Sequence, residues 1–191
     1  MRALERACAA TTSAALLGSL ALMFAAGCAP ATAPADGVPA PELGVATVDP
    51  ALAESPVGFS CIDLKGNTVS TATVEGRVTV LLFLTSYDPA STAEAEFLRD
   101  ISHTHAPRIN VVAFSLEREE NRPLMEGFAA AAKLEYPICI ADAETIAGRG
   151  TFAGMNSVPS VMILDRTGRA RYRYIGLQKP EELEAAITGV E

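Results

Sequence analysis

The chain has 191 residues, and 15 Lys and Arg against 23 Asp and Glu give it a formal net charge of -8. Its 49% hydrophobic content argues against a disordered chain, and its length gives one domain with its own core, too small for a two-domain cofactor enzyme, so no cofactor is expected. The acidic balance argues against nucleic-acid binding, and the 4 cysteines are too few for a disulfide scaffold and lack zinc-site spacing.

Residues 1–27 have the pattern of a secretory signal peptide. Two arginines give a basic start, and the apolar run that follows is too short to span a bilayer comfortably as a mature helix. It ends in Ala25-Ala26-Gly27-Cys28, which resembles the lipobox of bacterial lipoproteins, although that family usually has Leu where Ala25 stands. The resemblance implies lipidation of Cys28 and a bilayer-held protein of the bacterial cell envelope, facing the periplasm or the exterior. The alternative is ordinary signal cleavage, with Cys28 as a bystander thiol.

Residues 28–56 form an Ala- and Pro-rich tether. Half of the 12 prolines of the chain lie here, at Pro30, Pro34, Pro39, Pro41, Pro50 and Pro56. They prevent a regular helix, and no hydrophobic period is visible. At about 3.1 Å per residue, such a segment could hold a domain up to roughly 80 Å from the bilayer. We expect this segment to provide reach rather than chemistry.

From residue 57 to residue 191 the pattern is that of a folded domain. Residues 59–69 predict a hairpin that turns at Gly66-Asn67. Two apolar runs, residues 78–84 and 109–116, are typical of strands buried on both faces. Apolar side chains at helical spacing predict helices over residues 93–103 and 124–134.

The last third of the domain predicts shorter elements: an edge strand over residues 137–140, a short helix over 143–150, two strands over 161–164 and 169–175 joined by a tight turn, and a helix over 181–187 that Pro180 starts. Because strands alternate with helices and the last two strands form a hairpin, we expect an α/β fold with a mixed central sheet flanked by helices. This order is that of the thioredoxin-like fold, with an N-terminal β-hairpin and a central insertion.

An ordered set of short motifs runs through residues 57–190, none of them specific alone. They are Phe59 with Asp63-Leu64-x-Gly66, Gly76-Arg77-Val78, Glu94, Tyr136-Pro137, Val158-Pro159-Ser160, Ile163-Leu164-Asp165-Arg166-x-Gly168, Ile175-Gly176 and Glu182-Leu183. As a set they resemble the redoxin branch of the thioredoxin-like proteins, the tethered thiol-disulfide oxidoreductases of the TlpA and ResA type.

The centre of the motif set departs from that family. Its members carry Trp-Cys-x-x-Cys where the first buried strand meets the next helix, and here the matching stretch is Tyr87-Asp88-Pro89-Ala90-Ser91. Glu94 fixes the register, so Asp88 stands in place of the nucleophilic cysteine and Ser91 in place of the resolving one. Thiol–disulfide exchange needs two sulfurs, so this site cannot perform the reaction of the family.

Two interpretations of Asp88 remain open. Asp followed by Pro is a good helix N-cap, and Ser91 with Glu94 could instead form a capping box three residues later. The functional alternative is a carboxylate that hydrogen-bonds a ligand or partner.

The resemblance also implies a cis bond between Val158 and Pro159. In the family this proline faces the helix start and offers strand-like hydrogen bonds to an extended peptide. We therefore expect a shallow binding groove formed by Tyr87, Asp88, Pro89, Val158 and Pro159. The alternative is that Pro159 only supports the turn.

Cys61 and Cys139 are the thiols of the folded domain, and both lie on predicted strands among apolar neighbours. In the oxidising compartment to which export leads they could form a disulfide, and buried inert thiols are the alternative. Redox activity through this pair is a further possibility, although neither cysteine lies at a helix start.

Three charged groups are weaker candidates. A His-x-His at a helix end could hold copper or zinc, but without partner ligands nearby a favourable charge at the helix C-terminus is the preferred interpretation, and no metal is expected. Alternating arginines on a strand suggest a charge-protected sheet edge, with an acidic partner or lipid headgroup as the alternative. Acids after a strand suggest a solvated loop. The histidines are His103 and His105, the arginines are Arg169, Arg171 and Arg173, and the acids are Glu117, Glu119 and Glu120.

Together these patterns predict a membrane-tethered, extracytoplasmic thioredoxin-like domain that has lost its dithiol. We expect it to be redox-inactive and to bind an extended polypeptide or partner protein in the groove at Pro159. The alternative is a thiol-disulfide oxidoreductase that uses Cys61 and Cys139 or the thiols of a partner. A purely structural role in an envelope complex is a third possibility.

Overall fold

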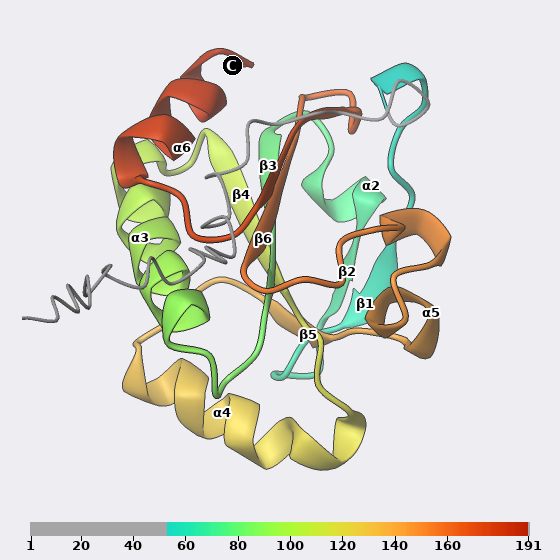
Figure 1. The fold of residues 1–191 in the computed structure, drawn as a ribbon. Helices are drawn as coiled ribbons and strands as arrows, with labels where there is room; N and C mark the ends of the chain where they lie inside the picture. Colours follow the sequence, from blue (N-terminus) through green and yellow to red (C-terminus); the bar gives the residue numbers. More distant parts are fainter. Residues whose placement is uncertain (1–52, 191) are drawn as a thin grey trace, which may run out of the picture. The chain divides into compact units, whose positions relative to one another are not determined.

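The structure is a computed structural model that describes residues 53–190 (Figure 1). Its strands are β1 (Ser60–Ile62), β2 (Thr68–Ser70), β3 (Val78–Leu84), β4 (Ile109–Ser115), β5 (Ile138–Ile140), β6 (Ser160–Leu164) and β7 (Ala170–Ile175). Its α-helices are α2 (Thr71–Val74), α3 (Pro89–His105), α4 (Arg122–Ala131), α5 (Ala143–Ile146) and α6 (Pro180–Thr188). The signal peptide, Cys28 and most of the tether lie outside the described residues, so those expectations stay predictions.

Five strands form one mixed sheet in the order β5-β4-β3-β6-β7. β3 and β4 are parallel neighbours in the centre, with Val78 beside Ile109 and Leu84 beside Ser115. β5 pairs in parallel with β4, whereas β6 is antiparallel to β3 and β7 is antiparallel to β6. Every residue of β3 is buried. A strand covered on both faces needs such an unbroken apolar run, so this pattern was readable from the sequence.

Two hydrophobic clusters lie on opposite faces of the sheet. α3, α4 and α6 pack on one face, where Leu98 and Leu183 are fully buried (Figure 1). The β1–β2 hairpin, α2 and α5 cover the other face, around Phe83, Phe114 and Phe152. The expected mixed sheet with flanking helices is therefore confirmed. Among helices of residues 53–190, none is long and apolar enough to cross a bilayer.

Several boundaries differ from the sequence expectation. α3 begins at Pro89 rather than at residue 93, because Asp88 serves as its N-cap. α5 ends at Ile146 rather than at residue 150, and Gly148 after it has a φ of 70°, in the left-handed region that stops a helix. The short α2 was not predicted. Its N-cap is Ser70, whose N–H donates to the Thr73 hydroxyl.

A disulfide between Cys61 and Cys139 joins β1 to β5, across 78 positions of sequence. The Cα atoms of the two cysteines lie 6.1 Å apart. Next to the bond, the Leu64 N–H donates to the Ile138 carbonyl at 2.8 Å, and Asp63 forms an isolated antiparallel bridge with Cys139. Of the two alternatives that the sequence left open for these cysteines, the disulfide is therefore the one present, and it fastens the N-terminal hairpin to an edge of the main sheet.

Loss of this bond should destabilise the domain. A cross-link that closes a ring of this size restricts the unfolded chain and contributes about 4 kcal/mol. We expect the double variant Cys61→Ser with Cys139→Ser to lower the free energy of unfolding by an amount of that order, measured by urea titration of the full-length chain. Equal unfolding midpoints for the variant and the oxidised protein would contradict a stabilising role.

Candidate functional site

The carboxylate of Asp88 closes the first turn of α3. Its Oδ2 accepts two hydrogen bonds from one residue, from the Ser91 N–H at 2.7 Å and from the Ser91 hydroxyl, also at 2.7 Å. The backbone of Asp88 is extended, as an N-cap requires, and Pro89 occupies the first turn, where no amide hydrogen is needed. N-capping by Asp88 is thus confirmed, and the alternative capping box started by Ser91 is wrong because Ser91 lies inside the helix.

Ser91 is fully buried behind Asp88. Its Oγ also lies 3.4 Å from the N–H of Thr85, the residue that follows β3. The two positions that the resemblance aligns with a cysteine pair therefore face each other, and they form a closed hydrogen-bonded unit of oxygen and nitrogen atoms. This unit offers no sulfur to a disulfide.

Pro159 lies at the same end of the sheet as the start of α3. β6 pairs with β3 so that Ser160 stands beside Phe83, which places Pro159 level with the end of β3. The Val158–Pro159 bond is cis, as the resemblance implied, and the Pro159 carbonyl accepts from the Gly176 N–H at 2.8 Å. Pro159 is buried and Val158 half-buried, whereas Tyr87 is 75% exposed. The expected groove residues thus share one end of the sheet.

Glu94 is a buried acid behind this end of the sheet. It is fully buried, and its Oε2 accepts from the Gln178 N–H at 2.9 Å. The Gln178 side chain donates in turn to the Gly176 carbonyl at 2.8 Å, so a chain of hydrogen bonds links α3 to the strand end at Pro159. Burial raises the pKa of Glu94 to about 7, although the Gln178 N–H works in the opposite direction.

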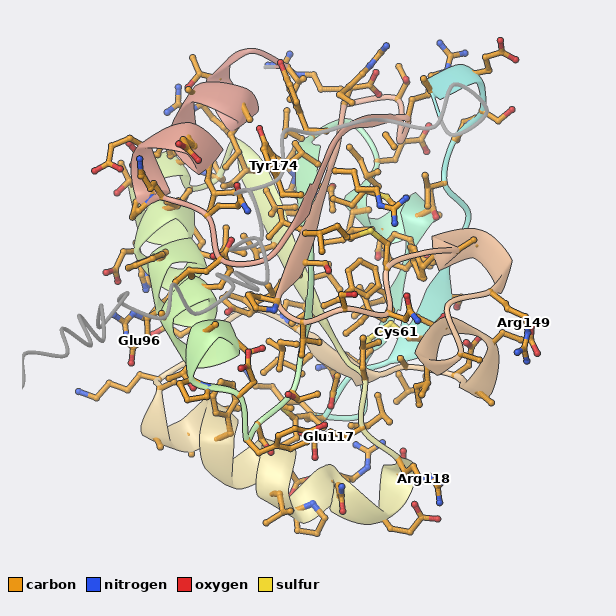
Figure 2. All side chains as sticks on the ribbon, viewed as in Figure 1. Cys61, Glu96, Glu117, Arg118, Arg149 and Tyr174 are labelled. Carbon is orange, nitrogen blue, oxygen red and sulfur yellow. A yellow bond between two sulfur atoms is a disulfide. The ribbon has the colours of Figure 1, made fainter. Side chains whose placement is uncertain are left out.

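Glu117 contradicts the expectation of a solvated loop. It follows β4 and is only 4% exposed, and its Oε1 accepts from the Ser86 N–H at 2.6 Å. The parallel pairing of β3 with β4 explains this contact, because residues that follow neighbouring parallel strands emerge side by side. The second oxygen, Oε2, is buried and has no hydrogen-bond partner. Glu119 and Glu120, in contrast, are exposed as expected. Figure 2 shows Glu117 below the sheet, beside the loop between β3 and α3.

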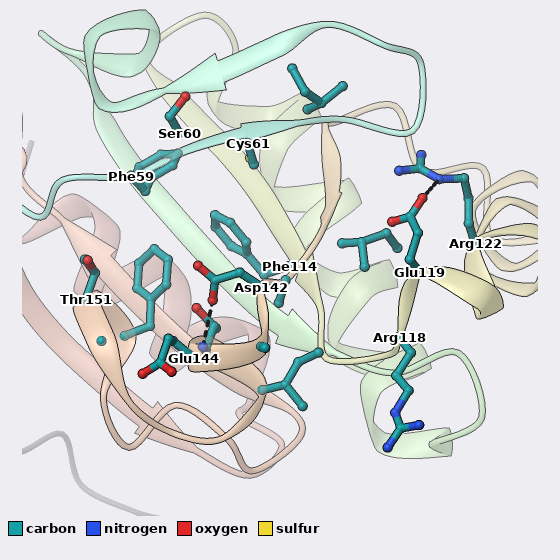
Figure 3. A pocket seen from close by; sticks show the side chains of 18 of the residues that line it. Phe59, Ser60, Cys61, Phe114, Arg118, Glu119, Arg122, Asp142, Glu144 and Thr151 are labelled. Atoms are coloured by element: carbon teal, nitrogen blue, oxygen red, sulfur yellow. Dashed lines mark hydrogen bonds and ion pairs between the residues drawn. The ribbon is translucent and has the colours of Figure 1, made fainter.

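A cavity of about 980 Å³ lies beside the disulfide, on the face opposite α3 (Figure 3). Phe59, Phe114 and Phe152 contribute apolar walls, and acidic and basic side chains lie at the rim. Cys61 lines this cavity and is half-buried, whereas Cys139 is fully buried and does not line it. Only one sulfur of the bond is therefore within reach of a ligand.

The histidines lie at the end of α3. His103 lies 3.9 Å from the Glu135 carboxylate, and His105 is buried. Within residues 53–190, no group of three or more His, Cys, Asp or Glu side chains is placed to hold a metal ion.

The arginines of the last strand are on an edge, since β7 ends the sheet. However, the expectation that all three simply face solvent is wrong. Arg171 is exposed and pairs with Asp165 at 2.7 Å, while Arg169 and Arg173 are half-buried and Arg173 donates to the Gly154 carbonyl. The strand end packs against the segment before β6, which covers part of the expected basic face.

Comparison with known proteins identifies the fold. No protein-family model matches the chain, and no curated protein matches it. Among solved structures, a thioredoxin-family thiol:disulfide interchange protein from Chlorobium tepidum TLS is similar with a TM-score of 0.63 and 16% identity, over 71% of this chain and 94% of that one. StoA from Bacillus subtilis gives 0.57 and 23%, over 69% and 96%. A secreted Mycobacterium tuberculosis disulfide oxidoreductase gives 0.58 and 19%, over 74% and 99%. At these identities the similarity shows the fold alone, which is thioredoxin-like.

Removal of the cap should destabilise α3. In Asp88→Ala the buried Ser91 hydroxyl and the Ser91 N–H both lose their acceptor, which should cost about 1–2 kcal/mol of unfolding free energy. Asp88→Asn keeps an acceptor oxygen and is the matched control, with a smaller expected loss. Chemical denaturation of the three proteins checks this, and equal stabilities would mean that the cap contributes nothing.

Glu94 should make stability depend on pH. Because its pKa of about 7 in the folded protein lies above its ordinary value of 4.5, the folded state binds the proton more tightly. Its contribution is therefore complete below pH 4.5 and is lost as pH rises through about 7, by an amount on the order of 3 kcal/mol. Glu94→Gln should remove this slope, whereas Glu96→Gln, an exposed neighbour on α3, should keep it. Urea unfolding at pH 5 and pH 8 measures the difference, and an unchanged slope in Glu94→Gln would contradict the assignment.

Proposed function

We propose that this protein is an extracytoplasmic thioredoxin-like domain, held at the membrane through Cys28, that binds an extended polypeptide beside Pro159 and does not exchange disulfides at the start of α3. The observation that carries the proposal is the closed contact between Asp88 and Ser91, whose hydroxyl and N–H both donate to one carboxylate oxygen. The scaffold around a dithiol is retained while the reactive atoms are replaced.

The chemistry at this position excludes the reaction of the family. Exchange requires a thiolate that attacks one sulfur of a disulfide and a second thiol that resolves the mixed disulfide. The Asp88 carboxylate is an anion at a helix N-terminus, so it keeps the charge that such a site favours, but it forms no bond to sulfur that could be resolved. Binding without turnover is what remains.

Exposed apolar side chains near Pro159 favour a polypeptide as the bound molecule. Four large hydrophobic residues of the described chain are exposed, and two of them, Tyr87 and Ile175, lie at this end of the sheet. Ile175 pairs with Ser160, the residue that follows Pro159. Tyr87 directly precedes Asp88, the N-cap of α3. A chain segment laid across this end would bury both side chains, which is a typical way for an extended peptide to gain affinity.

The proposed location rests on the leader and on the cysteines. The resemblance of residues 25–28 to a lipobox supports anchoring through Cys28, and a disulfide between Cys61 and Cys139 is the oxidation state expected outside the cytoplasm. One of the structurally similar proteins is described as secreted. The bound partner would accordingly be a protein or peptide of the cell envelope.

A second candidate function is thiol–disulfide exchange through Cys61 and Cys139, favoured by the position of Cys61 on a cavity wall. An external thiolate could attack only Cys61, because the other sulfur is fully buried. Cys139 would then have to leave as a thiolate inside an apolar core, where burial disfavours the charged form. We therefore place this function second.

Two measurements test the proposal on the full-length chain. A disulfide-reductase assay should give no turnover for the natural protein, whereas Asp88→Cys with Ser91→Cys should create an oxidisable dithiol with measurable turnover. A reduced and alkylated protein that cannot refold serves as the extended polypeptide. We expect it to bind, and Tyr87→Ala with Ile175→Ser to weaken binding about tenfold by removing apolar contact area.

Leu124→Ala is the matched control, since Leu124 is an exposed apolar residue on α4, at a different place in the fold, and its loss should leave binding unchanged. Turnover by the natural protein that is lost in Cys61→Ser would instead favour the second candidate. Absence of binding to the unfolded polypeptide would overturn the proposed function.

A further inference from the structure

Two carboxylates near the start of α3 form no ion pair with a described basic side chain. Asp88 is half-buried and Glu117 almost completely buried, yet no Lys, Arg or His of the described chain forms an ion pair with either of them. Hydrogen bonds from Ser91 stabilise the Asp88 charge, and one hydrogen bond from Ser86 stabilises the Glu117 charge. Burying a carboxylate without a counter-charge is unfavourable, so both groups gain from an added cation.

Both carboxylates are associated with one short loop, the one between β3 and α3, although Glu117 itself follows β4. Glu117 Oε1 accepts a hydrogen bond from the Ser86 N–H at 2.6 Å. Asp88 follows Ser86 by two residues, so the Cα atoms of Ser86 and Asp88 are at most about 7.6 Å apart. The Glu117 side chain therefore points at the loop that carries Asp88. Its Oε2 is buried without a hydrogen-bond partner, which leaves one acceptor unused at this loop.

The nearest cation in sequence does not neutralise this site. Arg118 directly follows Glu117, but its side chain is exposed and lines the cavity beside Cys61 (Figure 3). Arg122 pairs with Glu119. The charge of Asp88 and Glu117 is thus not balanced by an ion pair within residues 53–190, and the low dielectric of the surrounding protein strengthens its field at this end of the sheet.

The ring of Tyr87 stands beside Asp88 in the chain and is 75% exposed. An aromatic face next to a carboxylate suits a Lys or Arg side chain, because the cation can pair with the carboxylate while its stem or guanidinium plane covers the ring. Both residues lie at the end of the sheet where Pro159 is found.

We propose that the polypeptide bound beside Pro159 carries a Lys or Arg side chain, which lies between Tyr87 and Asp88 in the field of Glu117. This inference rests on the proposed function, because it assigns the chemistry of the bound segment. The former electron-transfer position thereby becomes a recognition site for positive charge.

The test uses the full-length chain and unstructured Ser/Val peptides in which a single Arg is moved through the sequence, each with a twin that has neutral citrulline in place of Arg. We expect at least one Arg peptide to bind about tenfold more tightly than its twin at low salt, and the preference to shrink at high salt. Asp88→Asn and Glu117→Gln should each reduce the preference several-fold. Glu120→Gln, an exposed acid of the same segment, should leave it unchanged.

The neutral twin separates the possible failures. If Glu117→Gln binds the citrulline peptide as the natural protein does, the variant is folded and its loss of Arg preference is electrostatic. If the natural protein binds Arg peptides and their twins equally, the cation site is wrong while the proposed function stands. If Asp88→Asn and Glu117→Gln both retain the full preference, the site is also wrong. If no peptide binds at all, the proposed function itself fails.

Discussion

One carboxylate oxygen accepting two hydrogen bonds from Ser91 is the contact on which the character of this protein depends. In the oxidoreductases that the motif set resembles, the same two positions hold sulfurs whose pairing and separation is the reaction. Here Asp88 and Ser91 keep the mutual approach, but hydrogen bonds of an N-cap join them instead of a disulfide. The thioredoxin-like fold is thus present with a hydrogen-bonded oxygen pair at the start of α3.

The buried acids around this contact show how the rest of the scaffold depends on it. Glu94 lies one turn further along α3 and reaches the strand end at Pro159 through Gln178 and Gly176, so hydrogen bonds hold the helix and this strand end in register. Glu117 accepts a hydrogen bond from the Ser86 N–H and so holds the loop between β3 and α3. Both acids thus fix the positions of backbone segments at this end of the sheet.

Much of the fold was predictable, because its determinants are local. The predominantly apolar runs identify β3 and β4, and Asp88 followed by Pro89 marks the start of α3. The pairing of Cys61 with Cys139 remained one of two alternatives until the structure placed β1 against β5. Glu117 was missed because its neighbours Glu119 and Glu120 suggest a solvated loop. Its burial depends on a contact with Ser86, 31 residues away, that no local pattern reports.

The arginines at and before β7 also show that a local sequence pattern does not predict tertiary contacts. Strand alternation predicts all three on one side of an edge strand, but Arg169 precedes β7 and the pairing of β7 with β6 shifts register between Ile163 and Leu164. In addition, Arg173 donates to the Gly154 carbonyl of the segment before β6. Periodicity gives the direction of a side chain and says nothing about what a distant loop brings to it.

The bridge between β1 and β5 has a consequence for how the domain matures. Only Cys61 and Cys139 lie in the described chain, so oxidation within it has a single intramolecular product and no wrong isomer to correct. The two cysteines are 78 positions apart, and the hairpin that comes first in the chain can be locked only after β5 has followed it. When the chain appears N-terminus first, β3, β4 and β5 must therefore follow before the disulfide can fix β1.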